Sequence, residues 1–208
     1  SVQLTARRES MPERPSFALE NVTVTYTTHE GGGVRALDEV SLDIAPGEHV
    51  ALVGASGAGK TTVARVLLRF VEPSGGTRRA DGVDARDVAP DAWRRAVAFV
   101  PQQPHLFHDT VAANIRLARP DASDEEVEGA ARAARVHDVI AALPQGYATV
   151  VGERGARLSG GQAQRVALAR AFLKDAGLVI LDEWSAHLDV RLESELREAA
   201  SRLLEGRS

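Results

Sequence analysis

The stretch GASGAGKTT, residues 54–62, decides the fold of this chain. It matches the pattern G-x-x-x-x-G-K-[ST], in which glycines let backbone N–H groups turn inward around phosphate oxygens. A short apolar run, HVALVG (49–54), precedes the loop, and TTVARVLLRF (61–70) follows it with helical spacing. We therefore predict the order strand, phosphate loop, helix, which a chance turn rich in glycine and serine would not provide.

The residues of this loop have separate expected roles. Lys60 should reach the β- and γ-phosphates of a nucleotide, and the Thr61 hydroxyl should be a ligand of Mg²⁺. The sequence contains only two lysines, Lys60 and Lys174, so a lysine in the loop indicates a specific use. The other loop residues expected to bind the nucleotide are Gly54, Ser56, Gly57, Ala58, Gly59 and Thr62. No N-K-x-D motif for reading guanine is present, which argues against a GTPase.

A second apolar run ends in two acids. GLVILDE (177–183) is typical of a buried strand, and Asp182 at its end is placed to hold Mg²⁺ through water. Glu183 follows directly and is placed to act as a general base on the attacking water. An acid pair after a strand can also be a solvated turn, but the phosphate loop elsewhere in the chain favours the catalytic interpretation.

Length, composition and charge exclude several classes of protein. The 208 residues are 44% hydrophobic and 26% charged, an ordinary globular balance, and the net charge of −4 gives no basic surface for nucleic acid. The absence of cysteine excludes a disulfide framework and a thiolate metal site. No run approaches the roughly 20 apolar residues of a membrane helix, so we expect a soluble chain.

The order of elements predicts an α/β fold with a P-loop NTPase core. Strands alternating with helices favour a mostly parallel sheet, while FALENVTVTY (17–26) and VRALDEVSLDI (34–44) predict an N-terminal antiparallel β subdomain. PSGGT (73–77) is typical of a turn. We expect residues 1–15 to be a linker or tail, residues 16–208 to be the ATP-binding domain, and about 106–156 to be an inserted subdomain of helices only, with Ser123 capping one of them.

The stretch SGGQ, residues 159–162, opens a second glycine-rich helix start. Ser159 and Gln162 fit a capping box, which is the plain structural interpretation. A cap does not account for Gly160 and Gly161, because glycine in a first helical turn costs up to ~1 kcal/mol relative to alanine. Helix N-termini attract anions. We therefore predict that an anionic group approaches here, held by another copy of the chain or by a homologous partner.

The chain resembles an ATP-binding-cassette (ABC) nucleotide-binding domain from about Phe17 to the end, because LSGGQ (158–162) is the signature of that family. In the family two domains pair head to tail, and each ATP lies between the phosphate loop of one and the signature of the other. The resemblance implies that Ser159 and Gly161 contact the partner's γ-phosphate, with Gly160 and Gln162 completing the site. It also implies ATP and Mg²⁺ as cofactors.

The same resemblance implies roles for further residues. Tyr26 resembles the aromatic residue that stacks on adenine, although spacing alone fits an exposed or core tyrosine equally well. Gln102 resembles the Q-loop glutamine, which touches Mg²⁺ or the attacking water and senses the membrane partner; Gln103 is the alternative. AHLD (186–189) resembles the D-loop, with Asp189 at the dimer interface. GERG (152–155) resembles a loop of exporter-type transporters.

A narrower resemblance rests on HLFHDTVAANIRLARPDAS (105–123) and LPQGYATVVGERGARLSGGQAQRVALARAFL (143–173), which look similar to the CydD-type subunit of bacterial thiol exporters. It implies export of glutathione or cysteine for cytochrome bd assembly, at the cytoplasmic face of a bacterial plasma membrane. The implied partners are a transmembrane domain and a second nucleotide-binding domain, either another copy or a CydC-type subunit.

The chain also departs from the family pattern. The family's switch histidine follows one further strand, so we expect a domain truncated before that strand, and Trp184 stands where proline or alanine is usual. Two alternatives to an exporter motor stay open. One is a non-transport ABC ATPase, for which long coiled-coil insertions or tandem cassettes would be typical. The other is an ATP-dependent dimerisation module with little hydrolysis.

Overall fold

The computed structural model describes residues 7–27, 32–153, 155, 158–183 and 190–208. The chain divides into two compact units. Unit 1 contains residues 1–97, 176–180 and 206–208, and unit 2 contains residues 98–175 and 181–205. None of the helices in these described ranges combines the length and the apolar character that crossing a bilayer requires.

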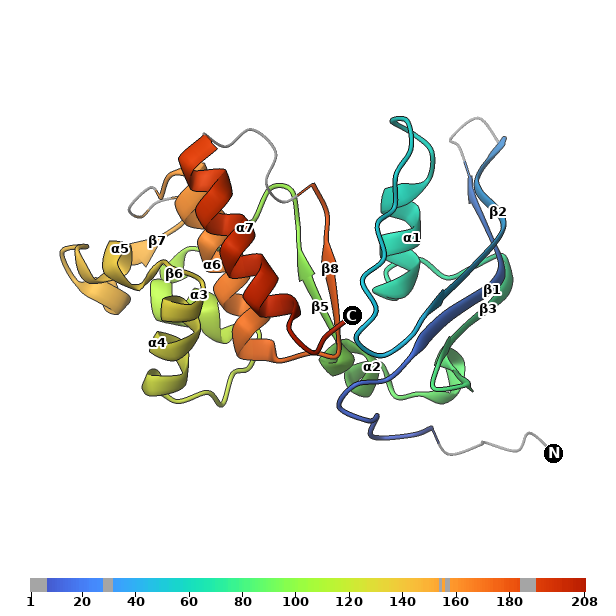
Figure 1. Ribbon diagram of the computed structural model, residues 1–208, viewed down its shortest axis with the longest axis horizontal. Helices are drawn as coiled ribbons and strands as arrows, with labels where there is room; N and C mark the ends of the chain where they lie inside the picture. The colour runs from blue at the N-terminus through green and yellow to red at the C-terminus, as the bar shows by residue number, and fades with distance from the viewer. Residues whose placement is uncertain (1–6, 28–31, 154, 156–157, 184–189) are drawn as a thin grey trace. The chain divides into compact units, whose positions relative to one another are not determined.

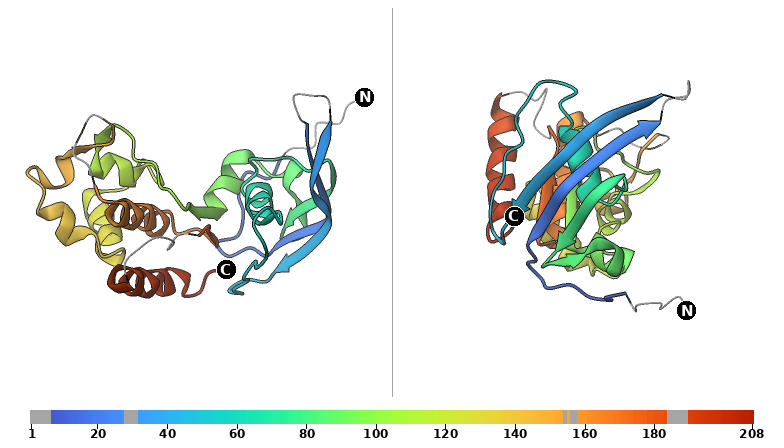
Figure 2. Two further views of the ribbon diagram at one scale, coloured as in Figure 1. Left: turned by 90° about the horizontal axis from the view of Figure 1, so that it is seen from above. Right: turned by 90° about the vertical axis from the view of Figure 1, so that its right-hand side faces the viewer.

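Unit 1 is built on an antiparallel four-stranded sheet (Figures 1 and 2). Its order is β2 (Gly33–Ile44), β1 (Phe17–Thr27), β3 (Gly75–Ala80) and β4 (Val83–Asp84). The helical elements are α1 (Lys60–Leu67), the 3₁₀ turn η1 (Ala85–Asp87) and α2 (Pro90–Ala96). The alternation of apolar and polar residues in β1 buries Leu19, Val22 and Val24 on one side. The predicted antiparallel subdomain is confirmed, whereas the turn predicted at 73–77 gives way to strand β3 from Gly75 onward.

Trp93 of α2 centres the core of unit 1. Its side chain is fully buried, its ring meets that of Phe17 edge to face at 5.4 Å, and its Nε1–H donates to Leu67 O at 2.8 Å. The guanidinium groups of Arg69 and Arg78 lie 5.8 and 5.4 Å from the centroid of the indole. These contacts tie the end of α1 to the sheet and to α2, which fixes the helix that follows the phosphate loop.

The strand predicted at residues 49–54 is wrong. These residues adopt no regular strand, and Val53 is 93% exposed. A strand forms only when a neighbour completes its ladder of hydrogen bonds, and no such bond to residues 50–53 is found in the described part of the chain. The apolar pattern of residues 49–54 indicates that the segment can be buried, but it does not show whether a neighbouring strand is there to pair with it.

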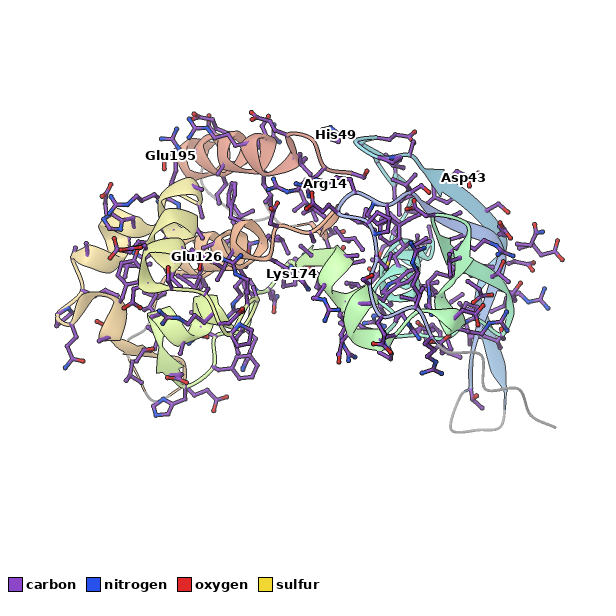
Figure 3. All side chains as sticks on the ribbon, turned by 90° about the horizontal axis from the view of Figure 1, so that it is seen from below. Arg14, Asp43, His49, Glu126, Lys174 and Glu195 are labelled. Atoms are coloured by element: carbon purple, nitrogen blue, oxygen red, sulfur yellow. The ribbon has the colours of Figure 1, made fainter. Side chains whose placement is uncertain are left out.

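Unit 2 is mainly helical, and α6 (Gly160–Lys174) packs against α3, α4 and α7, whose bounds follow (Figure 1). The other elements are β6 (Asp109–Thr110), α3 (Val111–Arg116), α4 (Asp124–Ala133), α5 (His137–Ala141), the 3₁₀ turn η2 (Gly146–Ala148), β7 (Val150–Val151) and α7 (Val190–Leu204). Leu168 of α6, Ile115 of α3 and Leu196 of α7 are fully buried. Glu195 of α7, labelled in Figure 3, pairs with Arg165 of α6.

The prediction that residues 106–156 contain helices only is also wrong. β6 and β7 pair antiparallel, with Asp109 opposite Val151 and Thr110 opposite Val150. Strands of two residues are too short to produce a period of two in the sequence. The remaining strands, β5 (Val97–Val100) and β8 (Leu178–Leu181), make a two-stranded sheet. The boundary between unit 1 and unit 2 falls inside each of these strands.

The cap predicted at Ser123 is confirmed. Ser123 Oγ accepts from the Glu126 N–H at 3.2 Å, and Glu126 Oε2 accepts from the Ser123 N–H at 2.8 Å. This backbone contact, with Arg119 beside the carboxylate, lowers the pKa of Glu126. The acids of the first turn, Asp124, Glu125 and Glu126, are exposed to solvent, where their charge favours the positive end of the helix dipole.

Residues 7–15, expected to be a linker, make specific contacts within unit 1. Arg8 forms a parallel bridge with Val88, and the Arg14 guanidinium donates to Ala176 O at 3.1 Å. A Cβ on Gly177 would lie 2.7 Å from Glu13 O and 2.8 Å from Pro15 Cδ, so this backbone passes directly over Gly177. The segment is thus part of the folded unit, and the boundary at residue 16 stays a prediction.

Candidate functional site

The phosphate loop of unit 1 is exposed and lies against its own lysine. Lys60 Nζ donates to Gly54 O at 2.8 Å and to Ala55 O at 2.9 Å. These carbonyls carry no net charge, and no carboxylate pairs with Lys60 among the described residues. An ammonium group held only by neutral acceptors keeps its charge available for an anion that enters the loop.

Gly59 is required by the backbone at the end of the loop. Its φ is +91°, a conformation that glycine adopts without strain. A Cβ there would also lie 2.8 Å from both Ala36 O and Leu37 Cδ2 of β2. The loop therefore reaches α1 by a path that only glycine allows.

The start of α1 presents free backbone donors. The first intrahelical bond runs from the Val63 N–H to Gly59 O at 2.9 Å, so the N–H groups of Lys60, Thr61 and Thr62 precede it. The Thr61 side chain is exposed, whereas Thr62 is only 8% exposed. Thr61 thus has the hydroxyl available to a metal, and Thr62 can offer its N–H. Free donors, the helix dipole and Lys60 together fit a polyphosphate.

Gln102 and Glu183 meet in unit 2. The side-chain amide Nε2 of Gln102 donates to Glu183 Oε2 at 3.0 Å. Asp182, between β8 and Glu183, is fixed by a bond from its N–H to Val100 O at 3.0 Å. Glu183 has φ +43°, a left-handed conformation that a non-glycine residue adopts at a cost. The turn therefore aims an exposed carboxylate at Gln102.

The stretch SGGQ starts α6 with a complete capping box. Ser159 Oγ accepts from the Gln162 N–H at 3.3 Å, and Gln162 Oε1 accepts from the Ser159 N–H at 2.8 Å. A Cβ on Gly160 would meet nothing within 4 Å, and Gly161 is buried. The capping box accounts for Ser159 and Gln162. Packing within the described chain does not require a glycine at position 160, so the space beside Gly160 is open to a ligand.

The remaining predicted residues lie apart from these contacts. Tyr26 is half-buried at the end of β1, opposite Val34, and its hydroxyl is buried without a hydrogen-bond partner in the described part of the chain. Gln103, the alternative to Gln102, is exposed. Asp189 and Trp184 lie outside the described residues.

Sequence reasoning missed three residues that hold the Gln102 segment. Gln164 and Arg170 of α6 and Asn114 of α3 bond to backbone atoms between Pro101 and Thr110. A polar residue on the packed side of a helix interrupts its apolar stripe. Such interruptions at Asn114, Gln164 and Arg170 were the sequence signal that these side chains form hydrogen bonds within the fold.

Comparison with known proteins places these residues in a family. Residues 37–186 match the family described as ABC transporter. The chain is 52% identical over 173 residues to an ATP-dependent lipid A-core flippase of Chromobacterium violaceum, covering 83% of this chain and 30% of that protein. It is 44% identical over 195 residues to heavy metal tolerance factor 1 of Caenorhabditis elegans, covering 94% of this chain and 24% of that protein.

A solved structure agrees with the sequence relatives. A bacterial Atm1-family ABC exporter with ATP bound matches 97% of this chain and 35% of its own chain, with a TM-score of 0.87 and 40% identity. This confirms the predicted α/β P-loop NTPase fold. The chain spans about a quarter to a third of the length of these relatives. The chain belongs to the ABC transporter family, as an ATP-binding ATPase domain of the exporter type related to Atm1-family exporters and lipid A-core flippases.

Proposed function

We propose that this domain binds Mg·ATP, pairs head to tail with a second nucleotide-binding domain, and hydrolyses ATP to drive export through a transmembrane domain. The observation that carries the hydrolytic part is the 3.0 Å bond between Gln102 Nε2 and Glu183 Oε2. It brings the two side chains that would orient and deprotonate a water within reach of one another.

Nucleotide binding rests on the phosphate loop. Lys60 would exchange its bonds to Gly54 O and Ala55 O for the β- and γ-phosphate oxygens. The loop residues Ser56, Gly57, Ala58 and Gly59, with the N–H groups of Thr61 and Thr62, would surround the phosphates. Tyr26 would stack on the adenine through its aromatic face.

Metal binding would use the Thr61 hydroxyl, the Asp182 carboxylate and the Gln102 amide oxygen, because hard oxygen donors suit Mg²⁺. When bound, the ion neutralises phosphate charge that develops during transfer. Glu183 would accept the proton of the attacking water, and the Gln102 amide would hold both the carboxylate and the water in line.

Pairing would use the start of α6. Ser159 and the N–H groups at Gly160 and Gly161 would face the γ-phosphate held by the other domain, with Gln162 keeping the helix start capped. Asp189 would lie at the same interface. A nucleotide that binds only the closed pair shifts the equilibrium toward that pair, and its hydrolysis removes the shift.

The relatives and the narrower resemblance support our proposals for the location and the cargo. The relatives are longer than this chain and include flippases of bacteria, so we place the domain at the cytoplasmic face of a bacterial plasma membrane. Thiol export, with a CydC-type partner, is supported only by the two stretches quoted for the CydD-type resemblance. The names of the relatives point instead to lipid A-core and to heavy-metal tolerance, which makes lipid flipping the second candidate.

The decisive test compares Glu183→Gln with Glu125→Gln, which removes an exposed acid of α4. We expect Glu183→Gln to lower kcat for ATP hydrolysis by about 10²–10³-fold while ATP affinity is retained, because it removes only the base. Glu125→Gln should leave both unchanged. ATP-dependent pairing with no hydrolysis in the parent chain would contradict this proposal and favour the dimerisation module.

A further inference from the structure

Gln164 lies one turn after the glycine-rich start of α6 and bonds directly to the segment that carries Gln102. Its side chain is 3% exposed, and its Nε2 donates to Pro101 O at 3.0 Å. Pro101 immediately precedes Gln102. The amide of Gln164 therefore fixes the peptide from which the Gln102 side chain starts toward Glu183.

Arg170 holds the far end of the same segment. Its Nη1 donates to His105 O at 2.9 Å, its Nε to Asn114 O at 2.8 Å and its Nη2 to Asn114 Oδ1 at 2.9 Å. Asn114, 1% exposed, accepts from the Phe107 N–H at 2.9 Å and donates to Phe107 O at 3.0 Å. The segment is thus attached to α6 at Pro101 and His105, and Asn114 of α3 holds it from Phe107 onward.

The chemistry of Arg170 marks it as a positioning group. Its guanidinium donates three hydrogen bonds, all to neutral oxygens, and no carboxylate pairs with it in the described ranges of unit 2. Burial lowers its pKa. Burying this charge without an ion pair costs desolvation free energy. In return, the planar guanidinium donates in two fixed directions, one toward His105 and one toward Asn114.

We infer that Gln164 and Arg170 are positioning residues that join α6 to the segment that carries Gln102, with Gln164 one turn after the signature and Arg170 farther along the helix. Contact of a partner-held phosphate with Gly160 would move the first turn of α6, and Gln164 would carry that movement to Pro101 and so to the Gln102–Glu183 bond. The two nucleotide sites of a pair are then coupled through a single helical turn. This inference rests on the proposed function for its consequence, whereas the link itself consists of bonds within this chain.

The link is tested first without nucleotide, by NMR of the side-chain amide of Gln102. The resonance is assigned by its loss in Gln102→Ala. We expect Gln164→Met and Arg170→Lys to shift it and lower its order parameter, as Glu183→Gln also does, while the melting temperature stays close to that of the parent. Arg132→Lys, which alters a surface pair with Glu128 on α4, should change nothing. A Gln102 amide that is unmoved by both variants overturns the inference, whether or not the chain hydrolyses ATP.

The second test is a double-mutant cycle on ATP hydrolysis. Gln164→Met should lower kcat about tenfold with unchanged ATP affinity, because the phosphate loop is untouched. The same change made in Gln102→Ala should have no further effect, since Gln164 acts through Gln102. An equal loss in both backgrounds would mean a general structural role and would reject the link. Absence of hydrolysis in the parent chain would instead count against the proposed function, and the NMR result would then decide the link alone.

Discussion

Gln102 donates its side-chain amide to Glu183 Oε2 at 3.0 Å, across 81 positions of sequence. Glu183 reaches this contact from a left-handed backbone conformation, with φ +43°. Strain of this kind persists where the surrounding structure holds a functional group in place. The pair is therefore the point at which the turn after β8 and the segment after β5 are brought together.

Replacement of Gln102 by glutamate should move the pH dependence of hydrolysis. A second carboxylate about 3 Å from Glu183 disfavours the doubly ionised state, so the pKa of one of the two acids rises. We expect the acidic limb of the kcat profile of Gln102→Glu to move upward by at least about one pH unit. Steady-state rates between pH 5 and 9 measure this, with Gln103→Glu as the control. Superimposable profiles would show that the two side chains do not meet during turnover.

Removal of the loop lysine should abolish nucleotide binding. Lys60→Met leaves the carbonyls of Gly54 and Ala55 with one donor fewer and takes away the cation that faces the phosphates. We expect ATP affinity, measured by calorimetry, to fall at least about 100-fold, because a charge-assisted phosphate contact is lost. The chain offers a matched control in Lys174→Met, which removes the only other lysine. Equal affinity of the two variants would exclude this loop as the phosphate site.

Asp84 predicts a pH-dependent contribution to stability in unit 1. Its carboxylate accepts from the Arg86 N–H at 2.9 Å and pairs with the Arg86 guanidinium at 2.7 Å, which lowers its pKa from 3.8 to about 2. Because the pKa is lower in the folded state, the stabilisation is complete above about pH 4 and is lost as the pH falls toward 2.

The corresponding variant is Asp84→Ala. We expect the free energy of unfolding to drop by about 1 kcal/mol at pH 7, since the variant loses the N-cap of η1 together with the ion pair. Urea unfolding at a series of pH values measures the difference. It should shrink between pH 4 and 2, and a difference that stays constant over that range would rule out an ionised Asp84 as its source.

The sequence predicted those elements whose pattern is local. β1 and β2 differ from the predicted ranges by one residue at one end each, because alternating burial is written into residues 17–27 and 33–44. The cap at Ser123 and the capping box at Ser159 were equally visible, since a cap needs only residues three positions apart.

The elements that were missed depend on partners far away in the chain. β3 contains Arg78, 3% exposed, whose Nη1 donates to Val66 O at 2.6 Å and whose Nη2 pairs with Glu72. A glycine-rich stretch that contains a charged residue is typical of a turn. Only the contacts of Arg78 with Val66 O and Glu72 show why it can be buried in a strand. The bonds of Gln164 and Arg170 are hidden for the same reason, because their acceptors lie 56 to 65 positions away.

In the proposed pair the start of α6 binds a nucleotide held by a second domain, and substitution of Gly160 is the direct test of this contact. A Cβ at Gly160 or at Gly129 of α4 would meet nothing within 4 Å, so leucine at either position should leave the fold intact and gain helix propensity. Both changes are made in Glu183→Gln, which should hold ATP without hydrolysing it.

Sedimentation velocity with Mg·ATP then compares the two variants. We predict that Gly129→Leu still forms the ATP-dependent pair, whereas Gly160→Leu stays monomeric with unchanged ATP affinity and an undiminished melting temperature. Pairing by Gly160→Leu equal to that of Gly129→Leu would contradict the account, because the partner's nucleotide would then not approach the start of α6.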